Sequence, residues 1–284
     1  MNYLNHAQMY SSWLIYVAIA FYSVATLLIA SHIRTTRPLP AQDSSTGRIR
    51  AAFALALVAC ALHAAAAFQV GYQSGSLNVS LHSMTLVVSA FVVSIFILGG
   101  LALPIRRLGV LVFPLTILCL VFALLWDEAP SAIASRGKAF TLHILISISA
   151  YALLAIASVQ ALLYAYQERQ IKHRANPAML MALPPLQTME ILWFRLVAMG
   201  FALLTLTLAS GVFFSQQIFG YAFAFKHHTV FAYLGWIVFA ILLYKRLRFG
   251  LRGAQAVTWT MGGFLLIQIG YFGTKIVSEL LAVQ

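Results

Sequence analysis

Two histidines lie within long apolar stretches of this sequence, where an ionisable side chain is costly and usually serves a function. The chain carries eight histidines beside only six acidic residues. His63 falls about two helical turns before the end of one apolar stretch. His143 falls at the start of another. Because neutral imidazoles ligate metal ions, including the iron of a haem group, these two residues are the first candidates for a site.

The helix faces that carry the two histidines indicate where other helices pack. Around His63 the residues three and four positions apart are small, which lets a second helix approach closely; the face comprises Ala52, Ala56, Ala59, Cys60, His63 and Ala67. The face with His143 also holds bulky residues, and it comprises His143, Ser147, Ala150, Tyr151, Leu154 and Ser158. If the two faces meet, both imidazoles can hold one iron axially. The alternative is that each histidine only forms hydrogen bonds between helices.

The composition identifies the elements that must position these residues. The chain has 284 residues, of which 62% are hydrophobic and only 8% are charged. Since a soluble domain carries about 25% charged residues, the sequence predicts an integral membrane protein. Lipid permits only helices or closed barrels, and long continuous apolar runs lack the alternation of barrel strands. We therefore predict an all-α polytopic membrane helical bundle, with residues 1–284 as a single integral membrane domain.

The apolar runs predict about eight transmembrane helices, since about 20 residues cross the hydrocarbon core. The spans are expected at 11–33, 49–70, 81–103, 108–126, 140–166, 191–214, 229–247 and 256–280. Basic residues concentrate in alternate connections, which the positive-inside rule assigns to the cytoplasm. Both termini are therefore predicted to lie outside, in a multi-pass protein of the bacterial inner membrane. The net charge of +12 comes mostly from these helix ends, and no nucleic acid is expected as a partner.

This topology places several weaker candidates at the outer surface. The loop before the seventh span reads Phe219-Gly220-Tyr221-Ala222-Phe223-Ala224-Phe225-Lys226-His227-His228. Its alternating aromatic residues suit a planar apolar ligand, but they are also typical of the aromatic belt at a membrane interface, which is the simpler interpretation. The weaker candidates for cofactor binding are His82, His227, His228, Phe223, Phe225 and Trp236. The remaining histidines, His6, His32 and His173, are expected to be solvated.

No catalytic residue is predicted. The sequence contains no GxSxG, P-loop or HExxH motif. All six acidic residues lie at or beyond the ends of the predicted spans, which argues against an ion-driven transporter. Cys60 and Cys119 both fall in apolar runs and form no CxxC pair, so they are interpreted as small buried hydrophobic residues.

The second half of the chain carries short motifs in a distinctive order. They are Leu142-His143-Ile144-Leu145, Tyr164-Ala165-Tyr166-Gln167, Leu183-Pro184-Pro185-Leu186-Gln187-Thr188-Met189-Glu190, Gly200-Phe201, Ser210-Gly211, Gly250-Leu251-Arg252-Gly253 and Tyr271-Phe272-Gly273. In this order they resemble the cytochrome c assembly family, which includes CcsA, CcmC and the HemX-like and YpjD-like proteins. The YpjD-like inner-membrane subgroup is the most similar.

This resemblance implies that the protein handles haem, presenting or transferring it at the outer membrane face for attachment to apocytochrome c. It implies His63 and His143 as axial ligands of the haem iron, with Phe223 and Phe225 covering the porphyrin. The implied partners are haem, the lipid bilayer, and apocytochrome c or other cytochrome assembly proteins. If the protein has an enzymatic role, the resemblance implies that it is one part of a haem-attachment system similar to a cytochrome c synthase.

The outer loop departs from the family pattern, which has a tryptophan-rich WWD loop. An ungapped comparison puts Phe219, Phe223 and Phe225 in the tryptophan positions. Lys226 takes the place of the aspartate, whereas Trp236 agrees with the pattern. The outer histidine that the family has after its last span is absent. The alternative function is therefore a non-catalytic accessory or regulatory membrane protein, of haem biosynthesis or of an ion transporter, that keeps the scaffold without bound haem.

Overall fold

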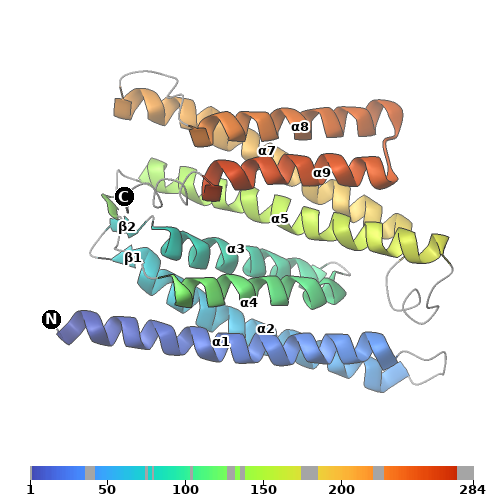
Figure 1. The fold of residues 1–284 in the computed structure, drawn as a ribbon, viewed down its shortest axis with the longest axis horizontal. Coiled ribbons are helices and arrows are strands. Elements are labelled where there is room, and N and C mark those ends of the chain that lie inside the picture. Colours follow the sequence, from blue (N-terminus) through green and yellow to red (C-terminus); the bar gives the residue numbers. More distant parts are fainter. Residues whose placement is uncertain are drawn as a thin grey trace. The chain divides into compact units, whose positions relative to one another are not determined.

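The computed structural model describes residues 2–35, 42–73, 76–78, 80–102, 105–126, 132–134, 138–173, 185–219 and 227–273. Among these residues helices dominate, and the predicted all-α class is confirmed (Figure 1). The helices are α1 (Asn2–Thr35), α2 (Gln42–Gly71), α3 (Leu81–Ala102), α4 (Gly109–Leu125), α5 (Lys138–Lys172), α7 (Leu186–Phe219), α8 (His227–Phe249) and α9 (Gly253–Gln268).

Each predicted span overlaps one of these helices, and the polytopic helical bundle is confirmed. Within the described ranges, six helices are long and apolar enough to cross a membrane, namely α1, α2, α3, α5, α7 and α8. The apolar helix α4 is shorter, and a π-helical turn over Ile269–Gly273 continues α9. The end of the last predicted span, after residue 273, lies outside the described residues. The orientation with both termini outside stays a prediction.

The chain divides into two compact units. Unit 1 comprises Met1–Ala134 and Arg169–Pro185, and it holds α1 to α4, coloured blue to green in Figure 1. Unit 2 comprises Ser135–Glu168 and Leu186–Gln284, and it holds most of α5 together with α7, α8 and α9. The single integral membrane domain inferred from the sequence stays a prediction.

Unit 1 is built around α2, which packs against α1 and α3, while α4 packs against the same two helices. The small-residue face predicted for this helix is its buried face, and it comprises Ala52, Ala56, Ala59, Cys60, His63 and Ala67. Larger rings fill the space around it: Tyr22 of α1 stacks on Phe113 of α4 with ring centroids 5.5 Å apart. Small residues on α2 thus allow close helix contact, and aromatic rings from its neighbours complete the packing.

Three short strands lie in the loops of unit 1. Strand β1 (Tyr72–Gln73) pairs antiparallel with β2 (Ser76–Asn78), which pairs antiparallel with β3 (Ala132–Ala134). No pattern in the sequence predicts these strands, because two or three residues are too few to show an alternation. They connect the segment after α2 with the segment after α4.

In unit 2, α8 packs against α7 and α9, and glycines mark its contact with α9. A Cβ atom added to Gly235 of α8 would lie 3.2 Å from the carbonyl oxygen of Gly263 in α9. A Cβ added to Gly263 would lie 2.9 Å from the ring of Phe239 in α8. The two helix backbones therefore approach closely at these glycines, as small residues permit inside membranes.

We expect Gly263→Ala to lower the free energy of unfolding by about 1–3 kcal/mol, the usual cost of overpacking. The matched control is Gly262→Ala, because nothing lies within 4 Å of a Cβ at that neighbouring position. Both variants gain the same helix propensity, so the difference between their unfolding free energies in detergent measures the α8–α9 contact. Equal stability of the two variants would contradict the packing described here.

Candidate functional site

His63 is fully buried in unit 1 and contacts α3. Its Nε2 atom lies 3.2 Å from Oγ of Ser89, and that hydroxyl donates to the carbonyl oxygen of Thr85 at 2.6 Å. A hydroxyl has one hydrogen to donate, so while Ser89 donates to Thr85 its oxygen accepts from His63 when Nε2 carries the ring hydrogen. The carbonyl of Leu86, 3.2 Å from the same hydroxyl, is a further acceptor beside the ring. Within the described residues, Nδ1 of His63 has no hydrogen-bond partner.

Neutral polar groups from three helices surround His63. Tyr22 of α1 contacts the imidazole edge-on, with ring centroids 6.2 Å apart, and its hydroxyl lies beside the Cys60 thiol. The sulfur of Cys60 is 3.2 Å from the hydroxyl of Ser94 in α3. In the part of the chain that the structure describes, no three His, Cys, Asp or Glu side chains group together to hold a metal ion. The surroundings of His63 therefore form a neutral polar cluster.

His143 lies near the start of α5, partly buried against α7. Its Nδ1 atom is 2.7 Å from Oγ of Ser210, and that hydroxyl donates to the carbonyl oxygen of Leu206 at 2.7 Å. With its hydrogen donated to Leu206, the Ser210 oxygen accepts from His143 when Nδ1 is the protonated ring nitrogen. The ring of Phe140 stacks on the imidazole, with centroids 6.5 Å apart. A Cβ atom added at Gly211 would lie 3.7 Å from Cε1 of His143, an ordinary van der Waals contact.

These arrangements can be compared with what a haem iron requires. A histidine that ligates a metal usually does so with its other ring nitrogen donating a hydrogen bond that fixes the ring. His143 contacts Ser210 through Nδ1, so a metal would be ligated through its other ring nitrogen, Nε2. His63 is held through Nε2 instead, so ligation through that atom requires the bond to Ser89 to break. The two histidines lie in different compact units, and each face packs within its own unit.

Trp236 and His82 are the weaker candidates whose side chains the structure describes. Trp236 of α8 donates from Nε1 to the hydroxyl of Thr205 at 2.9 Å and stacks on Phe201, with ring centroids 5.6 Å apart. Trp236 thus joins α8 to α7 inside unit 2. His82 lies in the first turn of α3 in unit 1 and is partly buried.

The other weaker candidates belong to the outer loop and its edge. His227 and His228 are the first two residues of α8. Phe223 and Phe225 lie outside the described residues, as does the rest of the loop over 220–226. Their role in covering a porphyrin stays a prediction.

His32 corrects one expectation from the sequence. It is buried, with 3% of its surface exposed, so the prediction that it is solvated is wrong. The physical reason is that α1 continues past it to Thr35 and packs against α2 and α4. His173 is exposed, as predicted. Both cysteines are free thiols, with Cys60 buried as predicted and Cys119 partly buried, and the solvation of His6 stays a prediction.

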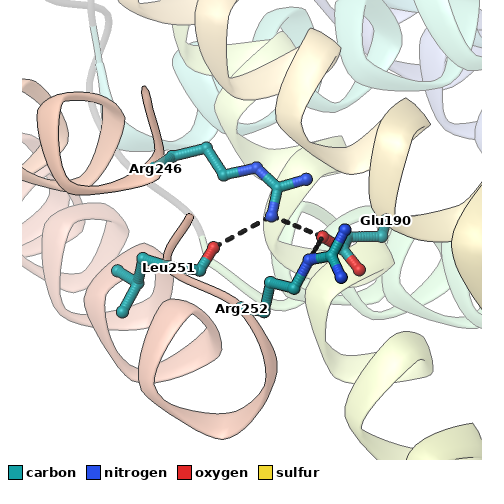
Figure 2. Close-up of polar contacts among 4 residues, drawn as sticks. All are labelled: Glu190, Arg246, Leu251 and Arg252. Atoms are coloured by element: carbon teal, nitrogen blue, oxygen red, sulfur yellow. Dashed lines mark hydrogen bonds and ion pairs between the residues drawn. The ribbon is translucent and has the colours of Figure 1, made fainter. Parts of the chain in front are cut away.

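A cluster of ion pairs joins α7, α8 and α9 in unit 2 (Figure 2). The carboxylate of Glu190, whose side chain is 8% exposed, lies 2.5 Å from Nη1 of Arg246 and 3.1 Å from Nε of Arg252. The same Nη1 donates to the carbonyl oxygen of Leu251 at 3.0 Å. The guanidinium of Arg246 also lies over the ring of Phe194, 4.4 Å from its centroid. One carboxylate thus holds the ends of three helices together.

The turn between α8 and α9 presents these groups to Glu190. Gly250 and Gly253 flank Leu251 and Arg252, and both have positive φ angles, of 64° and 63°, which favour glycine. The cluster therefore connects two of the short motifs noted in the sequence, at 183–190 and 250–253. One signal in the sequence could have indicated this cluster. Glu190 is an acidic residue on the same predicted side of the membrane as the arginines that follow the seventh span.

The fold and these contacts define a multi-pass helical membrane protein whose candidate histidines are held at contacts between helices. The profile of the family described as Cytochrome C assembly protein matches residues 51–282, and the chain belongs to this family. This confirms the resemblance inferred from the motifs. The six long apolar helices and the likeness to an inner-membrane relative also confirm a multi-pass inner membrane protein.

Three relatives illustrate the range of the similarity. Inner membrane protein YpjD of Escherichia coli (strain K12) is 33% identical over 140 residues, covering 49% of this chain and 52% of YpjD. Protein HemX of Brevibacillus brevis is 26% identical, over 79% of this chain and 84% of HemX. Cytochrome c biogenesis protein CcsA of Chlamydomonas reinhardtii is 25% identical, over 61% of this chain and 50% of CcsA. The match thus spans about half of the length of YpjD.

Proposed function

We propose that this protein binds haem and presents or transfers it at the outer membrane face during cytochrome c assembly. Membership of the family supports a role in that process, and one similar protein is named for cytochrome c biogenesis. The observation that carries the proposal is His143. Its Nδ1 atom is 2.7 Å from the hydroxyl of Ser210, which is the arrangement of an imidazole that binds iron through Nε2.

In this proposal His143 is the ligand of the haem iron, and His63 is kept as a weaker candidate. Haem, when bound, supplies an iron centre with positions for imidazole nitrogens. Ser210 orients the ring of His143, and the ring of Phe140 lies nearly parallel to it, with centroids 6.5 Å apart. His63 contributes only after its bond to Ser89 opens, and so ranks below His143.

The recipient in this proposal is apocytochrome c or another cytochrome assembly protein at the outer face. His143 lies near the start of α5, at the end that the positive-inside rule assigns to the outside. The other end of α5 carries Arg169 and Lys172 in its last turn, as expected for a cytoplasmic end. The predicted porphyrin contacts, Phe223 and Phe225, belong to the sequence before α8, which the positive-inside rule assigns to the same side.

This proposal is tested by measuring from which side of the membrane haem is released. Right-side-out and inverted membrane vesicles that contain the haem-loaded protein are mixed with apomyoglobin, a haem acceptor that cannot cross the bilayer. Haem should appear in the acceptor with right-side-out vesicles and stay in the membrane with inverted ones. Release only from inverted vesicles would contradict presentation at the outer face. A protein that takes up no haem at all would favour the alternative, an accessory or regulatory role without haem.

A further inference from the structure

We infer that the turn between α8 and α9 is a binding site for the headgroup of an anionic phospholipid. The site lies wholly in unit 2, and the side chains of Arg248 and Arg252 bind the phosphate, with Lys245 beside them. The bound group is the phosphodiester of a lipid such as phosphatidylglycerol or cardiolipin. This inference does not depend on haem, so it goes beyond the proposed function.

The turn lies where a membrane span ends. The candidate span in α8 covers Thr229–Phe249, so its last turn is where the helix leaves the hydrocarbon. Three apolar side chains near this end are largely exposed, namely Tyr244, Leu247 and Phe249. Three basic residues alternate with them, namely Lys245, Arg246 and Arg248. This mixture suits the membrane interface, where long basic side chains reach the headgroups and apolar ones contact acyl chains.

Basic groups outnumber acidic groups at this turn. Four cations fall within residues 245–252. In the described part of unit 2, two carboxylates lie near them. Glu190 pairs with two of the arginines, and Oε1 of Glu168 would lie 3.5 Å from a Cβ atom added to Gly253. The turn therefore keeps an excess of positive charge, which complements an anionic headgroup.

Arg252 is oriented by Glu190 and still has donors for a phosphate. Its Nε atom lies 3.1 Å from the carboxylate of Glu190 (Figure 2). A guanidinium carries five N–H donors in a rigid fork that matches the oxygens of a phosphate. Because 66% of the Arg252 side chain is exposed, the side chain is open to a ligand while the carboxylate holds it.

Arg248 is the second phosphate ligand. It is exposed, and within the described ranges of the chain its side chain has no hydrogen-bond or ion-pair partner. The turn between Arg248 and Arg252 is closed by two backbone hydrogen bonds, of 3.1 and 3.3 Å, which the amides of Gly250 and Leu251 donate to α8. This closed turn fixes the backbone positions of both arginines, which lowers the cost of ordering them around a ligand.

Lys245 adds a third cation to the same region. Its Nζ atom lies 4.5 Å from the centroid of the Trp259 ring in α9. This cation–π contact holds the ammonium group beside an aromatic residue of the kind found at membrane interfaces. Residues three positions apart are neighbours on a helix, so Lys245 and Arg248 lie on the same face of α8.

Native mass spectrometry of the full-length protein in detergent tests the site, with phosphatidylglycerol, cardiolipin or phosphatidylcholine added. We expect the two anionic lipids to bind more tightly than phosphatidylcholine. The double variant Arg248→Gln, Arg252→Gln should bind phosphatidylglycerol about 25-fold more weakly, at about fivefold for each cation near a membrane surface. Its affinity for phosphatidylcholine should stay the same. Arg248→Gln alone should lose about fivefold, and it breaks no hydrogen bond or ion pair of the described residues.

The matched control removes two other exposed cations from the same predicted side of the membrane. It is the double variant Arg48→Gln, Arg50→Gln at the start of α2, which should bind phosphatidylglycerol as the wild type does. Equal losses in the two double variants would indicate diffuse attraction and overturn the site, as would a wild type without preference for anionic lipids. Millimolar inorganic phosphate should leave the lipid bound, and displacement would overturn the assignment to a lipid.

Discussion

Glu190→Ala should lower the free energy of unfolding by about 3–5 kcal/mol, the typical cost of breaking a buried ion pair by removing one partner. The Glu190 side chain is 8% exposed and that of Arg246 is 21% exposed, so the variant leaves a largely buried arginine without its carboxylate. Arg246 also bonds the carbonyl of Leu251, so the turn between α8 and α9 loses its anchor to α7. Denaturant titration in detergent, followed by circular dichroism, measures this loss.

Arg252→Ala is the matched control for the Glu190 variant. Its side chain pairs with the same carboxylate but is 66% exposed, and exposed ion pairs contribute only about 0–1 kcal/mol. The control should therefore unfold close to the wild-type midpoint. A Glu190→Ala protein as stable as the wild type would contradict the role of this cluster in holding three helix ends together.

His143→Ala should weaken haem binding by more than about 100-fold, because losing even the hydrogen-bond partner of a ligating histidine costs about 10–100-fold. The reason is that His143 contacts a hydroxyl through Nδ1 and is only partly buried, whereas His63 is fully buried. His63→Ala should have a smaller effect, since this residue is enclosed and held through Nε2. Titration of the detergent-purified variants with haemin, followed at the Soret band, gives both affinities.

His173→Ala is the control for this comparison, because His173 is exposed beyond the end of α5 and should leave the affinity unchanged. A loss of affinity in His63→Ala alone would reverse the ranking of the two ligands. Equal losses in both single variants would mean that the bond to Ser89 does not keep His63 from iron.

Most of the fold follows from the hydropathy of the sequence, because each span is a long apolar run. The ends of the helices are less predictable. The helix α5 continues to Lys172 and α7 begins at Leu186, beyond the apolar runs, because polar residues extend a helix outside the hydrocarbon without penalty. His32 was predicted wrongly for a different reason. A histidine at the end of a span was expected to contact water, but neighbouring helices bury it.

The candidate site could be predicted only in part. An ionisable residue on a small-residue face indicates a buried position, and His63 is buried as that pattern predicts. The serine partners are 26 and 67 residues from their histidines in sequence, and no local pattern indicates which distant hydroxyl reaches an imidazole. The Glu190 cluster is not predictable from the sequence for another reason: charges at span ends indicate orientation, whereas the distances between them depend on how the helices pack.

Histidine-ligated haem is the central claim, and the absorption spectrum of the protein purified in detergent from haem-supplied cells tests it most directly. The wild type is compared with a double variant carrying His63→Ala and His143→Ala. We predict a sharp Soret band with low-spin features in the wild type and its collapse in the double variant. A wild-type protein without a haem band, or a band of equal strength in both proteins, would contradict the claim.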